Sequence, residues 1–100
     1  MEHTLIISGD TATLALKGRF TFNDKNTISS ILKDFLPSIV HCKLDVSNLE
    51  FIDSAGLGML ILAKDNISEK GGNFVLQRPQ GQVKRMLELS NFAELMSIAN

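Results

Sequence analysis

The chain has 100 residues, 44% of them hydrophobic, a formal net charge of −1 and one cysteine. This length allows one hydrophobic core, so we expect a single domain over residues 1–100. The near-zero charge offers no basic surface for nucleic acid or a membrane, and no apolar run reaches the roughly 18 residues that span a bilayer. The N-terminus lacks the pattern of a secretory signal, and we therefore expect a cytoplasmic protein.

The first forty residues predict a β-hairpin followed by a helix. Two short apolar runs, 5–7 and 12–16, flank a turn sequence at 8–11. Asn23 or Asp24 can then cap a helix, which Pro37 ends. The apolar positions of this helix repeat at helical spacing and are Ile28, Ile31, Leu32 and Phe35.

Two further strands follow, at about 42–47 and 73–77, each leading into a helix. The first contains Cys42 in an apolar alternation, which indicates a small core residue. The helix after it covers about 55–70 and ends at Gly71-Gly72. Beyond the second strand we expect a helix, a new cap at Ser90-Asn91 and a last helical turn or two. The apolar residues of this final part are Val83, Met86, Leu87, Phe92, Leu95 and Met96.

The alternation within the strands predicts a sheet with one apolar and one wet face. Leu5 and Ile7 in the first strand, and Phe74 and Leu76 in the last, face the apolar side in this scheme. Two successive right-handed β-α-β crossovers place their helices on the same face. We therefore expect an α/β fold: a mixed four-stranded sheet in chain order, with helices packed mainly on one face.

The segment from Asp53 to Met59 stands out at the junction of a strand and a helix. Ser54 is a good N-cap residue for that helix. Gly56 and Gly58 each cost about 1 kcal/mol relative to Ala within a helix, so they serve either close packing or the approach of a partner. Met59 is either an exposed, adaptable contact or a half-buried core residue.

The sequence does not predict an enzyme. A nucleophilic serine needs a base, and we find no Gly-x-Ser-x-Gly elbow and no glycine-rich phosphate loop with a lysine. His3 and His41 are far apart in sequence and suggest neither a metal site nor a catalytic triad. We expect no cofactor, no metal and no catalytic residue.

Asp53-Ser54-Ala55-Gly56-Leu57-Gly58, arriving after a strand and opening a helix, resembles the signature of STAS domains. The similarity is greatest to bacterial anti-sigma factor antagonists and extends over most of the chain. Gly18-Arg19-Phe20 resembles the family's Gly-x-hydrophobic element before the first helix. The segment 83–92 resembles the family's third helix.

This resemblance implies a partner-switching regulator with Ser54 as the phosphoacceptor. The implied kinase is also the anti-sigma factor and has a histidine-kinase-like ATPase fold, and a metal-dependent Ser/Thr phosphatase removes the phosphate. The regulator binds its kinase when Ser54 is unphosphorylated and releases it after phosphorylation. An alternative is a constitutive STAS subunit of a lipid-transport ABC ATPase complex.

The resemblance also suggests which residues contact the partner. Thr21 stands where relatives often carry Asp, a role that Asn23 or Asp24 could take over. Of Phe20 and Phe22, one is expected in the core and the other at the surface. Asp53 is either a site residue, which orients the serine hydroxyl or binds the kinase's metal indirectly, or a first-turn acid that suits the helix dipole. The expected partner-binding residues are Thr21, Phe22, Asn23, Asp24, Asp53, Ser54, Ala55, Gly56, Leu57, Gly58 and Met59.

Overall fold

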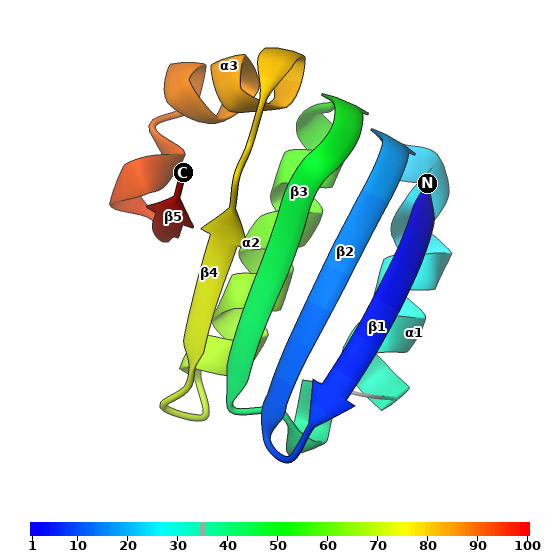
Figure 1. Ribbon diagram of the computed structural model, residues 1–100, viewed down its shortest axis with the longest axis vertical. Coiled ribbons are helices and arrows are strands. Elements are labelled where there is room, and N and C mark those ends of the chain that lie inside the picture. Colours follow the sequence, from blue (N-terminus) through cyan, green and yellow to red (C-terminus); the bar gives the residue numbers. More distant parts are fainter. Residues whose placement is uncertain (35) are drawn as a thin grey trace.

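The computed structural model describes residues 1–34 and 36–100 and shows a sheet backed by helices (Figure 1). Its strands are β1 (Glu2–Ser8), β2 (Thr11–Phe20), β3 (His41–Ile52), β4 (Asn73–Gln77) and β5 (Ser97–Ala99). Its α-helices are α1 (Lys25–Asp34), α2 (Ser54–Ser68) and α3 (Gly81–Leu89). The short 3₁₀ helices within the described residues are η1 (Phe22–Asp24), η2 (Leu36–Ser38) and η3 (Phe92–Glu94).

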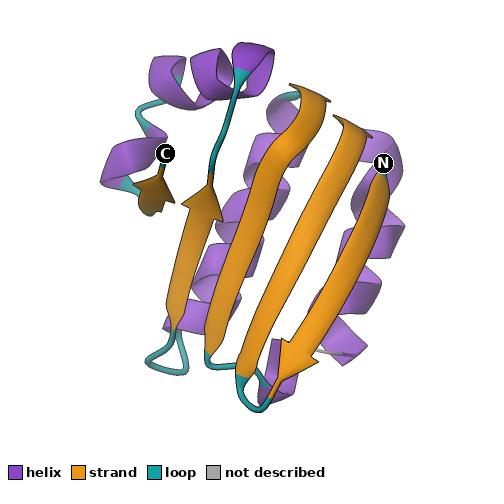
Figure 2. Ribbon diagram, in the orientation of Figure 1, coloured by secondary structure: helices purple, strands orange, loops and turns teal. Residues whose placement is uncertain are grey.

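The strands lie side by side in chain order, β1-β2-β3-β4-β5. β1 is antiparallel to β2, and the other neighbouring pairs are parallel. Helices α1 and α2 both cover one face of the sheet, as right-handed crossovers require (Figure 2). The predicted α/β architecture, mixed sheet and chain-order arrangement are confirmed.

The predicted number of four strands is wrong, because residues 97–99 form a fifth strand. They pair with β4 in the register Val75↔Ser97, Leu76↔Ile98 and Gln77↔Ala99. We expected helical turns up to this point, and only η3 is helical there. Three residues show no periodicity, so this strand depends on the open edge of β4 and has no signal of its own in the sequence.

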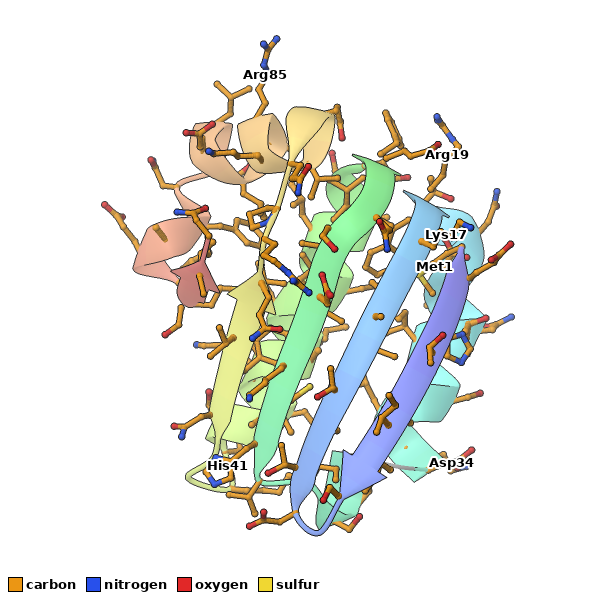
Figure 3. The ribbon with its side chains drawn as sticks, viewed as in Figure 1. Met1, Lys17, Arg19, Asp34, His41 and Arg85 are labelled. Carbon is orange, nitrogen blue, oxygen red and sulfur yellow. The ribbon has the colours of Figure 1, made fainter. Side chains whose placement is uncertain are left out.

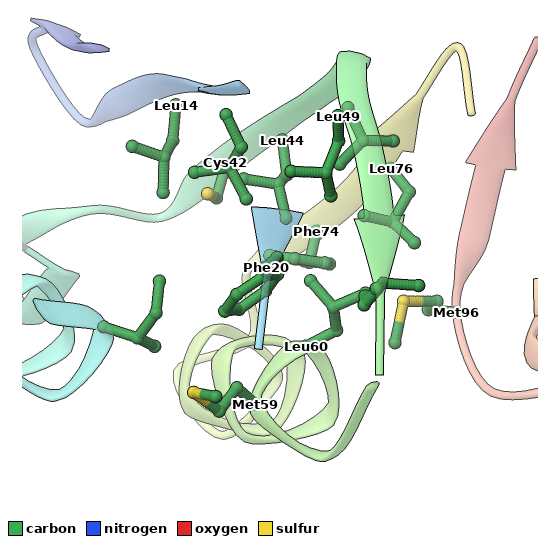
Figure 4. Packing of buried hydrophobic residues seen from close by; sticks show 14 of the residues in the cluster. Leu14, Phe20, Cys42, Leu44, Leu49, Met59, Leu60, Phe74, Leu76 and Met96 are labelled. Carbon is green, nitrogen blue, oxygen red and sulfur yellow. The ribbon is translucent and has the colours of Figure 1, made fainter. Parts of the chain in front are cut away.

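The core lies between the sheet and its two covering helices (Figure 4). Alternate residues of β2, β3 and β4 are buried there, as the strand pattern predicts. Ile7, which we expected to face the core, is 44% exposed because β1 is an edge strand. Cys42 is buried beside Leu14 and Leu44, as a small core residue.

β3 extends five residues beyond the predicted end at Ser47, and it contains two bulges against β2. Ala15 pairs with Asp45 but Lys17 with Asn48, and Gly18 pairs with Leu49 but Arg19 with Phe51. Each shift inserts one extra residue into β3. The buried positions beyond Val46 are therefore spaced by three, at Leu49 and Ile52, and the plain alternation disappears.

The first helical segment begins earlier than predicted, and neither Asn23 nor Asp24 is its N-cap. Thr21 caps η1, which runs directly into α1, and its hydroxyl accepts from the Asn23 amide at 3.3 Å. The Asp24 carboxylate accepts in return from the Thr21 amide at 2.9 Å, which completes a capping box. Phe35, expected on the apolar stripe of this helix, lies outside the described residues.

Candidate functional site

The turn between β3 and α2 is organised by Asp53. One oxygen of its carboxylate accepts a hydrogen bond from the Gly56 amide at 2.7 Å, so Asp53 is the N-cap of α2. The prediction that Ser54 caps this helix is wrong, since Ser54 is its first residue. A carboxylate at an N-cap also suits the helix dipole, and it leaves the serine hydroxyl unused by the cap.

Asp53 also ties the helix to the neighbouring chain segments. Its second carboxylate oxygen accepts from the Phe22 amide at 3.2 Å, and its own amide donates to the Phe20 carbonyl at 3.3 Å. One side chain therefore joins the end of β3, the start of η1 and the start of α2. The Asp53 carboxylate suits the helix dipole, as one of its predicted roles has it, but it acts from the N-cap position, which we had predicted for Ser54.

The outer side of α2 presents a stripe of four exposed residues. Ser54, Gly58, Leu62 and Asp65 follow one another at intervals of four, four and three residues, which places them on one helix face. Leu62 is 60% exposed although it is a large apolar residue in the middle of the helix. We did not single out Leu62 from the sequence, although its i+8 spacing from Ser54 could have revealed it.

The opposite side of α2 is packed against the sheet. Gly56, Leu57 and Met59 are buried, so none of these three expected partner-binding residues offers an accessible contact. Met59 is 7% exposed and belongs to the core, as Figure 4 shows. Helix α2 thus divides the predicted motif into an inner, packing half and an outer, accessible half.

The two glycines of the motif play different roles. A Cβ added to Gly56 would lie 2.7 Å from the Ile52 side chain and 2.8 Å from the Phe20 carbonyl oxygen. A Cβ added to Gly58 would meet no atom within 4 Å. Gly56 therefore serves close packing of the helix on the strand, whereas Gly58 leaves a smooth patch beside Ser54.

A surface hollow lies beside the N-terminus of α2 and is lined by the other residues that we expected to contact the partner. Phe20 is buried, whereas Phe22 is 62% exposed at the rim. The Arg19 guanidinium lies over the Phe51 ring, 4.0 Å from its centroid, in a cation–π contact. Figure 3 shows Met1 and Arg19 at this end of the molecule. The lining residues are Met1, Arg19, Thr21, Phe22, Asn23, Asp24, Phe51 and Asp53.

Other kinds of site find little support in the described part of the chain. Residues 1–34 and 36–100 contain no group of three or more His, Cys, Asp or Glu side chains arranged to hold a metal ion. Within the same residues, no helix is both long and apolar enough to span a membrane. Burial raises the pKa of the Cys42 thiol to about 11, which opposes formation of a reactive thiolate.

β3 is followed by the N-cap Asp53 and by helix α2, whose first residue is the exposed Ser54. This arrangement agrees with the STAS signature at residues 53–58. The family profile described as "Mlab, STAS domain" matches residues 3–97. The chain belongs to the STAS family.

Among its relatives, a STAS-domain containing protein of Pseudomonas aeruginosa is 26% identical over 91% of this chain and 90% of that protein. An anti-sigma F factor antagonist of Paenibacillus polymyxa is 34% identical over 58% of this chain and 50% of that protein. The match with this second relative thus spans half of its length.

Solved structures give the same fold. TM1081 of Thermotoga maritima, described as a candidate anti-sigma factor antagonist, has a TM-score of 0.89 and 26% identity over 98% of this chain and 86% of that one. The anti-sigma factor antagonist SpoIIAA in its unphosphorylated form has a TM-score of 0.75 and 17% identity over 99% of this chain and 88% of that one. This second likeness shows the fold alone.

Proposed function

We propose that this protein is an anti-sigma factor antagonist that binds its partner when Ser54 is unphosphorylated and releases it when Ser54 is phosphorylated. The observation that carries the proposal is the exposed face of α2, where Ser54 lies beside the bare Gly58 backbone and the exposed Leu62. Named relatives are anti-sigma factor antagonists. SpoIIAA has been solved in both phosphorylated and unphosphorylated forms, which supports a phosphorylation switch in this fold.

The chemistry of the turn is suited to accepting a phosphate. Because Asp53 already caps α2, the Ser54 hydroxyl can react without loss of the cap. A phosphate there adds about −1.5 to −2 charges, which the helix N-terminus favours by about 0.3 to 1 kcal/mol. The neighbouring Asp53 carboxylate opposes this gain. The fold should therefore change little on phosphorylation.

A bound partner would respond strongly to the same charge. Ser54, Gly58 and Leu62 are the uncharged residues of this face, whose far end carries Asp65, and the Phe22 ring of η1 is also exposed. A dianion buried at an interface fitted to a hydroxyl could cost about 3 to 4 kcal/mol, which weakens binding by a few hundredfold. Phosphorylation then weakens binding by placing charge in the contact surface, while the domain keeps its fold.

The expected partner is a serine kinase that is also the anti-sigma factor, with a histidine-kinase-like ATPase fold. A metal-dependent Ser/Thr phosphatase would reverse the modification in the cytoplasm. In this scheme the protein is the substrate of the phosphoryl transfer and no enzyme. The named relatives give no support to the alternative of a lipid-transport subunit, and the experiment below separates it from the switch.

The modification itself is tested by intact-mass measurement. The purified protein is incubated with ATP and an extract of the cells that express it, and we expect a gain of about 80 Da, the mass of one phosphoryl group. Ser54→Ala should abolish the gain. Ser68→Ala is the matched control, because Ser68 is also exposed and also belongs to α2. An unmodified wild-type chain, or a gain that survives in Ser54→Ala, contradicts the proposal.

The switch is tested by measuring how tightly the protein binds its kinase, which is purified from the extract by following phosphorylation of Ser54. Ser54→Ala should bind the kinase as the unmodified protein does, and Ser54→Asp should bind it poorly. Leu62→Lys should also weaken binding, because it places a charge on the same face. Equal binding of Ser54→Ala and Ser54→Asp would rule out a switch of this kind.

A further inference from the structure

The second half of β3 extends beyond its β4 neighbour. β4 pairs with β3 only from His41↔Asn73 to Asp45↔Gln77, whereas β3 continues to Ile52. β2 pairs with this part of β3 along one edge, and along the other edge α3 reaches the end of the strand through Gln82. Figure 1 shows α3 beyond the carboxyl end of β4, close to the end of β3. The polar backbone of β3 therefore needs other partners on this side.

Gln82, near the start of α3, supplies those partners at the last residue of the strand. Its side-chain Oε1 accepts from the Ile52 amide at 3.0 Å, and its Nε2 donates to the Ile52 carbonyl at 3.0 Å. One planar amide group thus makes the two bonds that a paired strand residue would make. Both bonds are partly buried, and Ile52 itself is fully buried.

Ile52 is the residue immediately before Asp53, so this clamp holds the chain where it enters the turn. Asp53 in turn receives the amides of Gly56 and Phe22, and Ser54 follows as the first helical residue. The two Gln82 hydrogen bonds, the peptide link from Ile52 to Asp53 and the Asp53 hydrogen bonds therefore connect α3 with the turn that presents Ser54.

We propose that Gln82 is a positioning residue for Ser54, acting through the backbone of Ile52 and the Asp53 cap. The inference rests on the proposed role of Ser54 as phosphoacceptor and extends the control of that site to α3. Gln82 touches no phosphate and no partner in this scheme. Its amide keeps the Asp53 carboxylate aimed at α2 and η1, so that the Ser54 hydroxyl faces outward for the kinase.

The test uses Gln82→Glu, because its effect depends on protonation. An ionised carboxylate accepts from the Ile52 amide but presents a second acceptor to the Ile52 carbonyl, whereas a protonated carboxyl can make both bonds. The matched control is Gln80→Glu, since Gln80 is exposed, lies two residues away and makes no side-chain capping bond. Amide hydrogen exchange at Ile52, Asp53 and Gly56 is measured by NMR at about pH 7.5, where a glutamate carboxyl is ionised, and at about pH 4, just below its ordinary pKa of about 4.3. Each variant is compared with the wild-type protein at the same pH.

At about pH 7.5 we expect Gln82→Glu to lower the protection of these amides by about tenfold, the effect of losing hydrogen bonds of ordinary strength. At about pH 4 the protection should return toward that of the wild-type protein, whereas Gln80→Glu should change little at either pH. Amides of the β1–β2 hairpin serve as an internal reference. An equal loss in the hairpin, the absence of recovery in acid, or the same behaviour in Gln80→Glu would overturn the inference.

Phosphorylation supplies the functional measurement. With the kinase preparation described above, Gln82→Glu should take up phosphate at Ser54 about tenfold more slowly than Gln80→Glu, in line with its loss of amide protection. Equal rates would show that Gln82 does not position Ser54. A wild-type chain that takes up no phosphate would overturn the proposed function instead, and amide exchange would still decide whether the clamp holds the turn.

Discussion

At the scale of single residues, the motif Asp53–Met59 separates into side chains with different tasks. Asp53 caps the helix, Ser54 is exposed at its first position, and Met59 packs in the core. Gly56 and Gly58 look equivalent in the sequence, but only Gly56 faces the backbone of another segment. Their difference comes from helix geometry, because two residues along a helix point to roughly opposite sides.

This difference predicts opposite effects of the same substitution. Gly56→Ala should destabilise the protein by about 1 to 3 kcal/mol, because its Cβ would press on Ile52 and on the Phe20 carbonyl. Gly58→Ala should stabilise it by up to about 1 kcal/mol through helix propensity, since its Cβ meets open space. Urea unfolding monitored by circular dichroism measures both. A Gly56→Ala variant as stable as the wild type would contradict the packing argument.

At the scale of elements, the start of the first helical segment explains how Thr21 can serve at a position where the STAS resemblance leads us to expect Asp. The Thr21 hydroxyl accepts from the Asn23 amide, and the Asp24 carboxylate completes the capping box from the other side. Asp and Thr both offer an oxygen acceptor at an N-cap, so the departure preserves the local structure. Asp24 also lies 3.4 Å from the amino group of Met1, which joins the N-terminus to this element.

The capping role of Thr21 predicts a graded mutational series. Thr21→Ala should destabilise the protein by about 1 kcal/mol, because the Asn23 amide loses its acceptor. Thr21→Asp should restore most of this stability, since its carboxylate can accept the same bond. Thermal unfolding of the three proteins at equal concentration gives the comparison. If Thr21→Asp were as unstable as Thr21→Ala, the side-chain oxygen would not be the stabilising feature.

At the scale of the whole molecule, the core is continuous from the β2 side of the sheet to α3 and η3. Cys42 lies within it and is 2% exposed. Burial raises the pKa of its thiol from 9.0 to about 11, and the positive charge of Lys70 offsets only part of this effect. The thiolate is the reactive form, and burial both disfavours it and blocks access to the sulfur. Reaction of Cys42 with a thiol reagent therefore requires the structure to open.

We therefore expect Cys42 to resist thiol reagents in the native protein at about pH 8 and to react fully in denaturant, measured by absorbance of the released reporter. The raised pKa also has a consequence for stability. The folded state retains the thiol proton above pH 9, whereas the unfolded state loses it, so the free energy of unfolding should fall as pH rises from 9.0 to about 11. A Cys42→Ala variant should lack this alkaline component. Rapid native labelling would contradict the buried position.

The sequence alone determined the parts of this protein that follow from local pattern. The alternation at Cys42, Leu44 and Val46, the glycine pair at 71–72 and the order of strands and helices are properties of neighbouring residues, because side-chain spacing and backbone preference act over a few positions. The STAS resemblance of the segment 53–58 belongs to the same level, and the match to the family profile confirms it.

The tertiary structure alone decided everything that depends on segments far apart in the chain. The bulges in β3 arise against β2, β5 forms only because β4 offers an edge, and Gln82 reaches Ile52 across 30 residues. The choice of Asp53 over Ser54 as the cap likewise involves Phe20 of β2 and Phe22 of η1, whose backbones form hydrogen bonds with Asp53. Such contacts leave no periodic trace in the sequence, because the packed chain alone brings the donors and acceptors together.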